Sequence, residues 1–362
     1  MKILYAIQGT GNGHISRARD IIPILKKKGE VDVLVSGIQS DVELPYPVKY
    51  KFRGLSFIFG KKGGVDLLET YKKSNLKNLL DEIRVLPVEN YDLVISDFEP
   101  VSAWACKIKN KVCIGLSHQA AVVNKTSPKP KYKDPVGKAV LKYYAPVTYS
   151  FGFHFEQYDK NIFTPVIRDQ IRLAKPKKSG HYTVYLPAYG DDQLIKVLSK
   201  ITNVQWQVFS KHNQKVQNIQ NVKIQPIDNN GFIRSMVNSI GVLCGAGFET
   251  PAEALFLKKK LMVIPMKGQY EQQCNASALH KMGIPVLKSL KKKHISKIED
   301  WVKKEQKITF DFKDETEHVI DLVIKTNASA NKSIVSANPT NISTVKKLKE
   351  KSFDKIIAKL SI

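Results

Sequence analysis

The chain has 362 residues, a length that predicts about two domains of ~150 residues each. Its 43% hydrophobic and 25% charged residues are typical of a folded globular protein, which excludes collagen, wholesale disorder and a protein with many membrane spans. The 58 lysines and arginines outnumber the 33 aspartates and glutamates, and the net charge of +25 predicts a positive face that attracts phosphates or an anionic bilayer.

Neither a membrane span nor a secretory leader is expected. No stretch approaches ~20 uninterrupted apolar residues, and the chain enters a strand pattern at its first residues. The cysteines have neither CxxC spacing nor paired histidines, which indicates reduced thiols and no zinc site. They are Cys106, Cys113, Cys244 and Cys274. The expected location is the cytoplasm, and a peripheral position on the inner face of the membrane is compatible with it.

The first half of the chain alternates strand and helix patterns. Residues 1–7 form a short apolar run, the turn QGTGNGH follows, and residues 15–25 have helical apolar periodicity. Later strand patterns lie at residues 31–35, 91–96 and 112–116. This alternation favours a mainly parallel sheet covered by helices on both faces.

The second half repeats the alternation after a boundary rich in proline and lysine at residues 164–180, which is expected to be exposed. Buried strand patterns follow at residues 182–186, 205–209, 222–225, 240–244 and 261–265. The sequence therefore predicts an N-terminal α/β domain at 1–165, a linker at 166–180 and a C-terminal α/β domain at 181–325.

The end of the chain, residues 326–362, is expected to be a polar linker followed by a basic amphipathic helix. The linker is polar and lacks periodicity, whereas apolar residues from Val345 to Ile362 fall on one stripe surrounded by lysines. The stripe and the lysines suit two roles equally, which are packing back on the protein and docking on a membrane surface.

A glycine loop follows the first strand. Gly9, Gly11 and Gly13 alternate there, and residues without a Cβ let backbone N–H groups at a helix N-terminus approach a ligand closely. The spacing G-x-G-x-G-H differs from the dinucleotide fingerprint G-x-G-x-x-G. The second strand also ends in Ser36 and Gly37 where that fingerprint expects an acidic residue, so a nicotinamide enzyme is disfavoured.

His14 begins the helix after this loop, and Asp97 ends the strand at residues 91–96. Both therefore fall at the same edge of the predicted sheet. A carboxylate bonded to one ring nitrogen fixes the histidine tautomer and raises the basicity of the other nitrogen, which predicts a general base. The alternatives are a structural His14 and an Asp97 that caps the following helix.

The second glycine turn lies in the stretch from Leu243 to Gly283. A strand ends at Cys244, the turn GAGFET follows, and a helix begins near Pro251, a favoured first helical residue. Backbone amides, the Thr250 hydroxyl and the helix dipole together predict a cradle for a diphosphate. Glu253, one turn inside the helix, is placed to accept hydrogen bonds from the two hydroxyls of a ribose.

This segment resembles the donor-binding segment of GT-B-fold, nucleotide-sugar-dependent glycosyltransferases. It is similar to UDP-glycosyltransferases and to the undecaprenyl-linked N-acetylglucosaminyltransferase of peptidoglycan synthesis. The residues that carry the resemblance are Gly245, Gly247, Thr250, Glu253, Pro265 and the block from Glu271 to Ala276, with GTGNGHISR and Asp97 in the first half. The resemblance implies a GT-B fold, an α/β architecture of two Rossmann-like doubly wound parallel-sheet domains with a cleft between them.

The resemblance also implies roles for individual residues. The expected donor-binding residues are Gly11, Gly13, Gly245, Gly247, Phe248, Thr250, Glu253, Glu271 and Gln272. Within this set the turn holds the diphosphate, Glu253 the ribose, and Glu271 and Gln272 the sugar. Ile227 and Phe232, in the loop before the turn, are the expected base contacts. His118 and Gln119 follow another strand at the crevice edge and are candidate acceptor contacts, with a structural role as the alternative.

The function implied is an inverting, metal-independent transfer of a sugar from a nucleotide-diphosphate donor, expected to be a UDP-sugar, to a hydroxyl acceptor that is lipid-linked or a glycan. Gly245 stands where many UDP-glycosyltransferases have a phosphate-binding histidine and retaining GT-B enzymes have a glutamate, which argues for inversion. No metal or cofactor is expected. The expected partners are the donor, the acceptor and an anionic membrane surface, with no specific nucleic acid.

Two other functions stay open. UDP-N-acetylglucosamine 2-epimerases share the fold and need no acceptor, although the acid and base residues that they require have no clear place in this chain. A non-catalytic polyanion-binding or nucleic-acid-binding protein is supported only by the charge, since no nucleic-acid motif is present.

Overall fold

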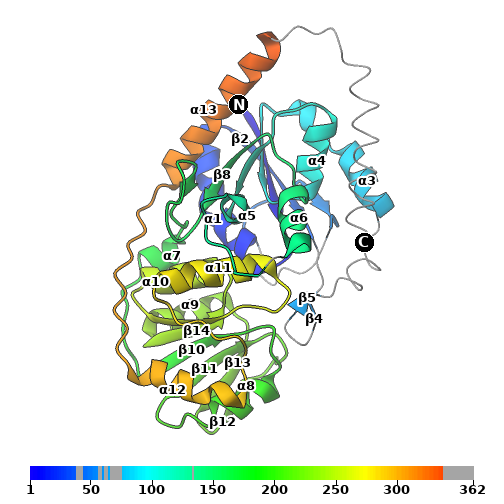
Figure 1. Ribbon diagram of the computed structural model, residues 1–362. Helices are drawn as coiled ribbons and strands as arrows, with labels where there is room; N and C mark the ends of the chain where they lie inside the picture. The colour runs from blue at the N-terminus through cyan, green and yellow to red at the C-terminus, as the bar shows by residue number, and fades with distance from the viewer. Residues whose placement is uncertain (38–43, 56–58, 61–63, 66–75, 133, 337–362) are drawn as a thin grey trace.

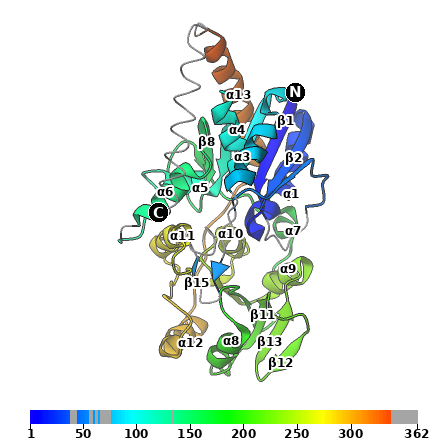
Figure 2. The same cartoon turned by 90° about the vertical axis from the view of Figure 1, so that its right-hand side faces the viewer.

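The computed structural model describes residues 1–37, 44–55, 59–60, 64–65, 76–132 and 134–336. The amphipathic helix predicted at 345–362 lies outside the described residues. Figures 1 and 2 show two α/β halves stacked one on the other, each built around its own sheet. The predicted two-domain α/β fold is confirmed. None of the helices in the described part of the chain is long and apolar enough to cross a bilayer.

The first half contains a seven-stranded sheet in the order β3-β2-β1-β6-β7-β8-β9, with every neighbouring pair parallel. Its strands are β1 (Lys2–Gln8), β2 (Glu30–Ser36), β3 (Tyr50–Phe52), β6 (Leu93–Asp97), β7 (Ile114–Ser117), β8 (Tyr149–Phe153) and β9 (Ile162–Phe163). A small antiparallel pair, β4 (Phe59–Gly60) and β5 (Gly64–Val65), stands apart. All five residues of β6 are buried because helices cover both faces of the sheet.

The helices of the first half are α1 (Asn12–Lys28), α3 (Leu76–Val85), α4 (Pro100–Ile108), α5 (His118–Val123), α6 (Pro135–Tyr143) and α7 (Asp169–Arg172), with a 3₁₀ turn η1 (Val88–Asn90). Helix α1 starts directly after β1, and Gly11 at its N-cap has a φ of 91°, a conformation that favours glycine. The loop between β1 and α1 therefore turns sharply at the carboxyl end of the sheet, where ligands bind in folds of this kind.

The second half has a six-stranded sheet in the order β12-β13-β11-β10-β14-β15, parallel except for the edge pair β12 and β13. Its strands are β10 (His181–Tyr185), β11 (Gln205–Ser210), β12 (Gln217–Ile219), β13 (Val222–Pro226), β14 (Gly241–Gly245) and β15 (Lys260–Ile264). Its helices are α8 (Asp191–Leu198), α9 (Asn229–Asn238), α10 (Glu249–Phe256), α11 (Tyr270–Lys281), η2 (Lys292–His294) and α12 (Ile295–Lys303). All four cysteines are buried and free.

The long helix α13 (Thr316–Ser336) returns to the first half, where it packs on α1 and β8 (Figure 1). Asn327 donates a hydrogen bond to the carbonyl of Asp92 at 2.9 Å. The expectation of an irregular polar segment from residue 326 was wrong as far as Ser336. Polar residues cover the outer face of the helix, while Ala330 continues its buried face. Residues 316–325 also pack on the first half, although they fall within the predicted second domain.

The segment predicted as an exposed linker is exposed only in its second part. Ile167, Arg168 and Ile171 are buried, whereas residues 175–180 are exposed. The largest hydrophobic cluster contains residues of both halves, including Ile21 and Phe153 from the first and Phe248 and Ala252 from the second. The two halves therefore share packed core in this structure.

Candidate active site

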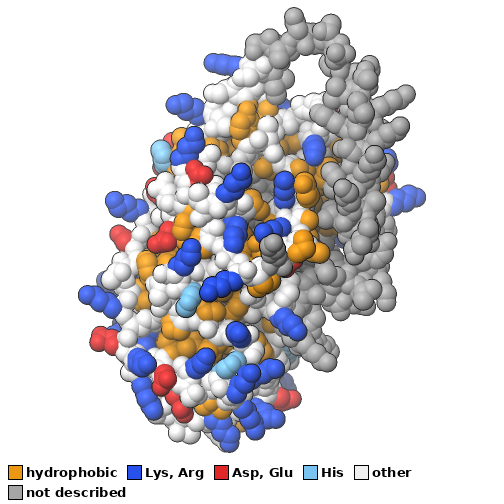
Figure 3. Space-filling model, in the orientation of Figure 1, with side chains coloured by type: hydrophobic (Ala, Val, Ile, Leu, Met, Phe, Trp, Pro, Cys, Tyr) orange, Lys and Arg blue, Asp and Glu red, His pale blue; other side chains and the backbone are white. Residues whose placement is uncertain are grey.

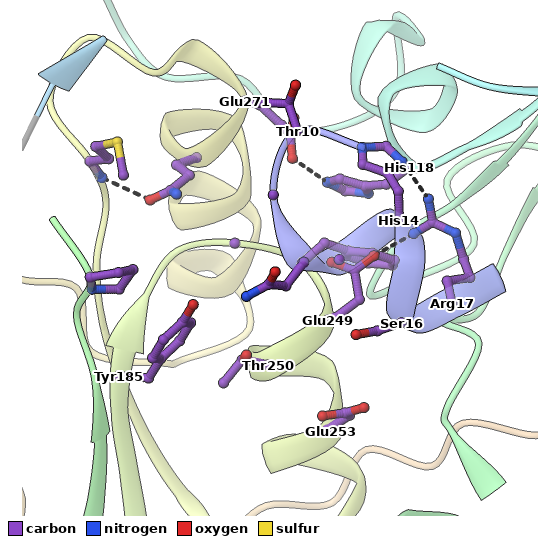
Figure 4. Close-up of a pocket in the computed structure, with 18 of the residues that line it drawn as sticks. Thr10, His14, Ser16, Arg17, His118, Tyr185, Glu249, Thr250, Glu253 and Glu271 are labelled. Atoms are coloured by element: carbon purple, nitrogen blue, oxygen red, sulfur yellow. Dashed lines mark hydrogen bonds and ion pairs between the residues drawn. The ribbon is translucent and has the colours of Figure 1, made fainter. Parts of the chain in front are cut away.

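A pocket of about 600 Å³ is lined by residues of both halves. Figure 4 shows side chains from the β1–α1 loop and α1 facing side chains from α10 and α11 of the other half. The predicted site residues that line it are Gly11, Gly13, His14, His118, Gln119, Ile227, Phe232, Gly247, Phe248, Thr250, Glu253, Glu271 and Gln272. Gly245 lines a smaller neighbouring pocket, and Asp97 lies behind His14.

His14 and Asp97 are brought together as predicted. The His14 Nδ1 atom lies 2.9 Å from Asp97 Oδ1, and the Asp97 carboxylate is fully buried. The alternative for Asp97 is wrong, because Glu99 caps α4 by accepting hydrogen bonds from the backbone N–H groups of Val101 and Ser102. Asp97 is therefore available to orient the histidine.

Arg17 is the main site residue that the sequence analysis missed. Its guanidinium is almost completely buried and donates to both carboxylate oxygens of Asp97, at 2.7 and 2.9 Å. It also forms an ion pair with Glu249 at the start of α10, in the opposite half. The available signal was its position three residues after His14, which puts both side chains on one face of the same helix.

Arg17 and His14 set the charge of Asp97. Burial by itself raises the pKa of this carboxyl, but the positive charge of Arg17 and the hydrogen bond with His14 outweigh burial, so the pKa lies below its usual value. For Arg17 the effects have the opposite sign. Burial lowers its pKa, but the carboxylates of Asp97 and Glu249 raise it by more, so the pKa lies above its usual value. Asp97 is thus ionised and acts as a hydrogen-bond acceptor at neutral pH.

The second glycine turn, predicted to hold a diphosphate, leaves the start of α10 uncapped at the pocket. Phe248 is the N-cap of α10, and no side chain in the described residues caps the first turn, so backbone N–H groups there are free to bind a ligand. A Cβ built on Gly247 meets nothing within 4 Å, because this glycine faces open space in the pocket. Gly13 of the first loop is close to the same place, since a Cβ there would collide with the Glu249 carboxylate.

Glu253 lies at the pocket wall with its carboxylate held by Arg168, which donates from Nε and, at 2.7 Å, from Nη2. Arg168 also donates to Asn229 Oδ1 at 2.8 Å. The sequence analysis missed Arg168 because it treated this segment as an exposed linker. A carboxylate has about four acceptor positions, so the arginine orients Glu253 and leaves capacity for ribose hydroxyls.

His118 and Gln119 both line the pocket, and His118 is held there by contacts on its ring face and on both ring nitrogens. The His118 ring is 1% exposed and stacks on Phe248 with centroids 3.9 Å apart. Its Nδ1 lies 2.8 Å from the Phe153 carbonyl and its Nε2 lies 2.8 Å from Asn275 Oδ1. Burial lowers its pKa. These contacts favour the structural alternative for His118, as a junction between the halves.

The remaining predicted residues form the far side of the pocket. Gln272 Oε1 accepts a hydrogen bond from the Met266 backbone N–H at 2.8 Å, which ties α11 to the end of β15. The Phe232 ring packs against Tyr185 and Phe209, with centroids 5.5 and 5.2 Å apart. The Tyr185 and Phe209 rings also line the pocket. The sequence did not indicate them as site residues, because each lies within a strand pattern typical of the hydrophobic core.

A family-level sequence model agrees with this arrangement. The model described as glycosyl transferase family 1 matches residues 1–305. The chain belongs to glycosyl transferase family 1. The resemblance noted from the two glycine motifs is therefore confirmed, and the protein is a glycosyltransferase. No curated protein matches the chain.

Solved structures share the fold of this family 1 glycosyltransferase at low sequence identity. MurG from Acinetobacter baumannii is 14% identical with a TM-score of 0.55, over 90% of this chain and 99% of that chain. UGT89C1 from Arabidopsis thaliana, complexed with UDP, is 12% identical with a TM-score of 0.55, over 90% and 94%. A Listeria monocytogenes protein described as a UDP-N-acetylglucosamine 2-epimerase is 12% identical with a TM-score of 0.52, over 91% and 97%. The GT-B fold is confirmed.

Metal binding is a separate property of the site. Within the described residues, no group of three or more histidine, cysteine, aspartate or glutamate side chains is arranged to hold a metal ion. Metal independence of this glycosyltransferase stays a prediction, and the same holds for the roles of its individual site residues.

Proposed function

We propose that this glycosyltransferase moves a sugar from a UDP-sugar to a hydroxyl acceptor with inversion and without a metal. One observation carries the proposal: His14, which Asp97 holds from behind, and the uncapped start of α10 just after Gly247 line the same pocket from opposite halves. A base and a diphosphate cradle across one cleft are the two parts that a single displacement needs.

In the proposed reaction the acceptor O–H gives its proton to His14 Nε2, and the oxygen attacks the anomeric carbon. The bond from that carbon to the diphosphate oxygen breaks, and its electron pair leaves with UDP. Asp97 at Nδ1 fixes the tautomer of His14 and stabilises the imidazolium that forms. Because there is one displacement, the anomeric configuration inverts.

The leaving diphosphate gains negative charge as it departs. The backbone N–H groups and dipole at the start of α10, with the Thr250 hydroxyl, are positioned to stabilise that charge. The Glu249 carboxylate lies close to this place and would repel a diphosphate, but its ion pair with Arg17 offsets its charge. Arg17 therefore serves both the base and the cradle.

We also propose that a surface on α6 docks on an anionic membrane and brings this enzyme to a lipid-linked acceptor at the inner face. No residue of α6 is buried, and exposed Tyr132, Val136 and Tyr143 lie in or beside it. The exposed lysines of the same surface are Lys131, Lys138 and Lys142. Figure 3 shows hydrophobic side chains among basic ones in this region, a pattern that suits an anionic bilayer. Helix α6 also contacts α5 and α11, which border the pocket.

The donor site is tested by the thermal stability of the purified protein with UDP, GDP, TDP or ADP, without added metal. UDP at ~100 times its dissociation constant should add ~2.7 kcal/mol of stability. The variant Gly247→Ala places a methyl group in the open space of the cradle and should abolish this gain. Replacing Glu253 is less suitable, because it leaves the buried Arg168 unpaired.

Gly190→Ala is the matched control. Its Cβ also meets nothing within 4 Å, its φ of −71° suits alanine, and it lies at the start of α8 outside the pocket. This variant should keep the full response to UDP. No response of the wild-type protein to any of the four nucleotides would overturn the proposed donor. Conversion of UDP-N-acetylglucosamine to its C2 epimer without an acceptor would favour the epimerase alternative.

A further inference from the structure

Gln119, the second residue of α5, connects His14 to the opposite half of the molecule. Its side chain is buried, and its Nε2 atom donates to Glu271 Oε2 at 2.9 Å. The same Nε2 atom lies 3.3 Å from His14 Nε2. One amide group therefore contacts both the nitrogen that the proposed reaction uses as a base and a residue expected to bind the sugar.

The proton positions follow from the partners. Asp97 is an ionised carboxylate, so His14 Nδ1 carries the hydrogen of their 2.9 Å contact. The other ring nitrogen, Nε2, then has a lone pair that accepts from the Gln119 amide. Glu271 also needs a donor, so both N–H bonds of Gln119 are in use. This assignment leaves Gln119 Oε1 buried without a hydrogen-bond partner among the described residues.

Charged groups around His14 come from four elements. Arg17 of α1 has its Nη2 atom 3.2 Å from His14 Nδ1, and Asp97 ends β6. Glu249 of α10 acts through Arg17, and Glu271 of α11 acts through Gln119. Asp97 is negatively charged and Arg17 positively charged, and both meet the ring at its Nδ1 side. Gln119 is uncharged. Its N–H group contacts His14 Nε2, so the hydrogen bond is formed only when this nitrogen carries a lone pair and no proton.

We infer that Gln119 is a positioning residue that keeps His14 Nε2 free of a proton and yields this nitrogen to the acceptor hydroxyl when substrate binds. The inference rests on the proposed function. The incoming O–H takes the place of the Gln119 N–H at Nε2, and the unpartnered Oε1 accepts a hydrogen bond from a substrate hydroxyl. Because the same amide binds Glu271, a sugar that engages Glu271 also loosens Gln119 from the base.

The inference is tested with Gln119→Glu and Gln119→Met in the full chain. Glutamate has similar length but presents a carboxyl oxygen to Nε2, which favours a ring protonated at both nitrogens. Methionine also matches the length and provides no hydrogen bond. Gln193→Met is the control, because Gln193 bonds to the Leu290 carbonyl at 2.6 Å outside the pocket.

The first readout is the ¹⁵N spectrum of the histidine rings at neutral pH, with the His14 signals assigned by their loss in His14→Gln. Wild-type protein and Gln193→Met should show a proton on Nδ1 and a lone pair on Nε2. Gln119→Glu should show both nitrogens protonated, and in Gln119→Met the Nε2 signal should shift with the loss of its donor. Unchanged His14 signals in the two Gln119 variants would overturn the inference.

The second readout is UDP release from UDP-glucose and UDP-N-acetylglucosamine across pH, with water as the acceptor. Gln119→Glu should lose about 100-fold in rate at neutral pH, the lower range for loss of a general base, and recover towards alkaline pH. Gln119→Met, which removes the donor without adding a carboxylate, should lower the rate less and move the pH profile in the same direction by a smaller amount. Equal losses in both variants with the same profile would indicate a merely structural residue. If the wild-type protein neither binds UDP nor releases it, the proposed function fails, while the spectra still decide the state of His14.

Discussion

Three consecutive residues at the end of β6 do three different jobs in this protein. Asp97 turns towards α1 and holds His14 and Arg17, while Glu99 turns towards α4 and caps it. Phe98 between them has a φ of 55°, a left-handed conformation that is uncommon for a bulky residue. Its ring stacks on Tyr144 with centroids 4.8 Å apart, which helps to hold the turn. The sharp turn lets two acidic residues on either side of Phe98 contact separate helices.

Asp20 should make stability depend on pH. Burial raises the pKa of this carboxyl to about 6, although a hydrogen bond from the Asp169 backbone N–H opposes the rise. The folded state thus holds this proton more tightly than the unfolded state, so the contribution of Asp20 is most favourable in acid and falls as pH rises from about 4 to about 6. Asp20→Asn should be more stable than wild type by ~1–2 kcal/mol above this range, after allowance for partial exposure.

Urea unfolding of wild type and Asp20→Asn at several pH values measures this effect. The difference in unfolding free energy between them should shrink as pH falls towards about 4. Asp311→Asn, at an exposed position, is the control for general effects of charge. A difference of the same size at every pH would contradict the assignment to Asp20.

At the scale of elements, α1 carries most of what connects the base to the rest of the molecule. His14, Arg17 and Asp20 recur at intervals of three, so they fall along one side of the helix. His14 contacts Asp97 beside the pocket, and Arg17 forms an ion pair with Glu249 of the opposite half. Asp20 accepts a hydrogen bond from the Asp169 N–H in the segment before β10. A single helix thus places the base and one contact to each neighbouring region.

Helix α6 gives a prediction at the same scale. The full-length protein should sediment with phosphatidylglycerol vesicles and much less with phosphatidylcholine vesicles, because the lysines need an anionic surface. Val136→Ser combined with Tyr143→Ser should weaken binding by about tenfold or more, since it removes apolar side chains that insert into the bilayer. Val216→Ser, at a residue 56% exposed on the second half, is the control and should bind like wild type. Equal loss in both variants would contradict an α6 membrane surface.

At the scale of the whole molecule, the two halves are joined by polar contacts as well as by shared core. Contacts that cross between them at the pocket include the polar pairs Arg17 with Glu249, Gln119 with Glu271 and His118 with Asn275, and the stacked rings of His118 and Phe248. Arg168, before the second sheet, is joined to Glu253. Each contact lies at the pocket, so the site is complete only when both halves meet.

Calorimetry tests this coupling. Wild-type protein should unfold in one transition, because the largest hydrophobic cluster and the ion pairs span both halves. Arg17→Met removes the arginine from its buried ion pair with Asp97 and should lower stability by ~3–5 kcal/mol. Arg84→Met is the control, since Arg84 is 73% exposed and pairs with Asp81 on the surface. Two well-separated transitions in wild-type protein would contradict a single cooperative unit.

The sequence by itself determined the architecture and the two motifs. Alternating strand and helix patterns are local properties of the chain, so they predicted both sheets, and the glycine turns followed because only residues without a Cβ suit such close approach. The helical stretch from residue 326 to Ser336 was not predicted, because its buried face is marked by few apolar residues. Because this stretch is mostly polar, its composition did not predict that α13 continues through it and packs on α1.

Only the tertiary structure decided which charged side chains meet. Arg17 and Glu249 are 232 positions apart, and Arg168 and Glu253 are 85 apart, so no local pattern pairs them. The sequence predicted Asp97 as the partner of His14 at a shared sheet edge, with a helix cap as the alternative, and in the structure Glu99 is the cap. Burial supplies the reason for the pairing: removing one partner leaves a buried charge without its opposite charge, which is costly, and folding decides which partner is within reach.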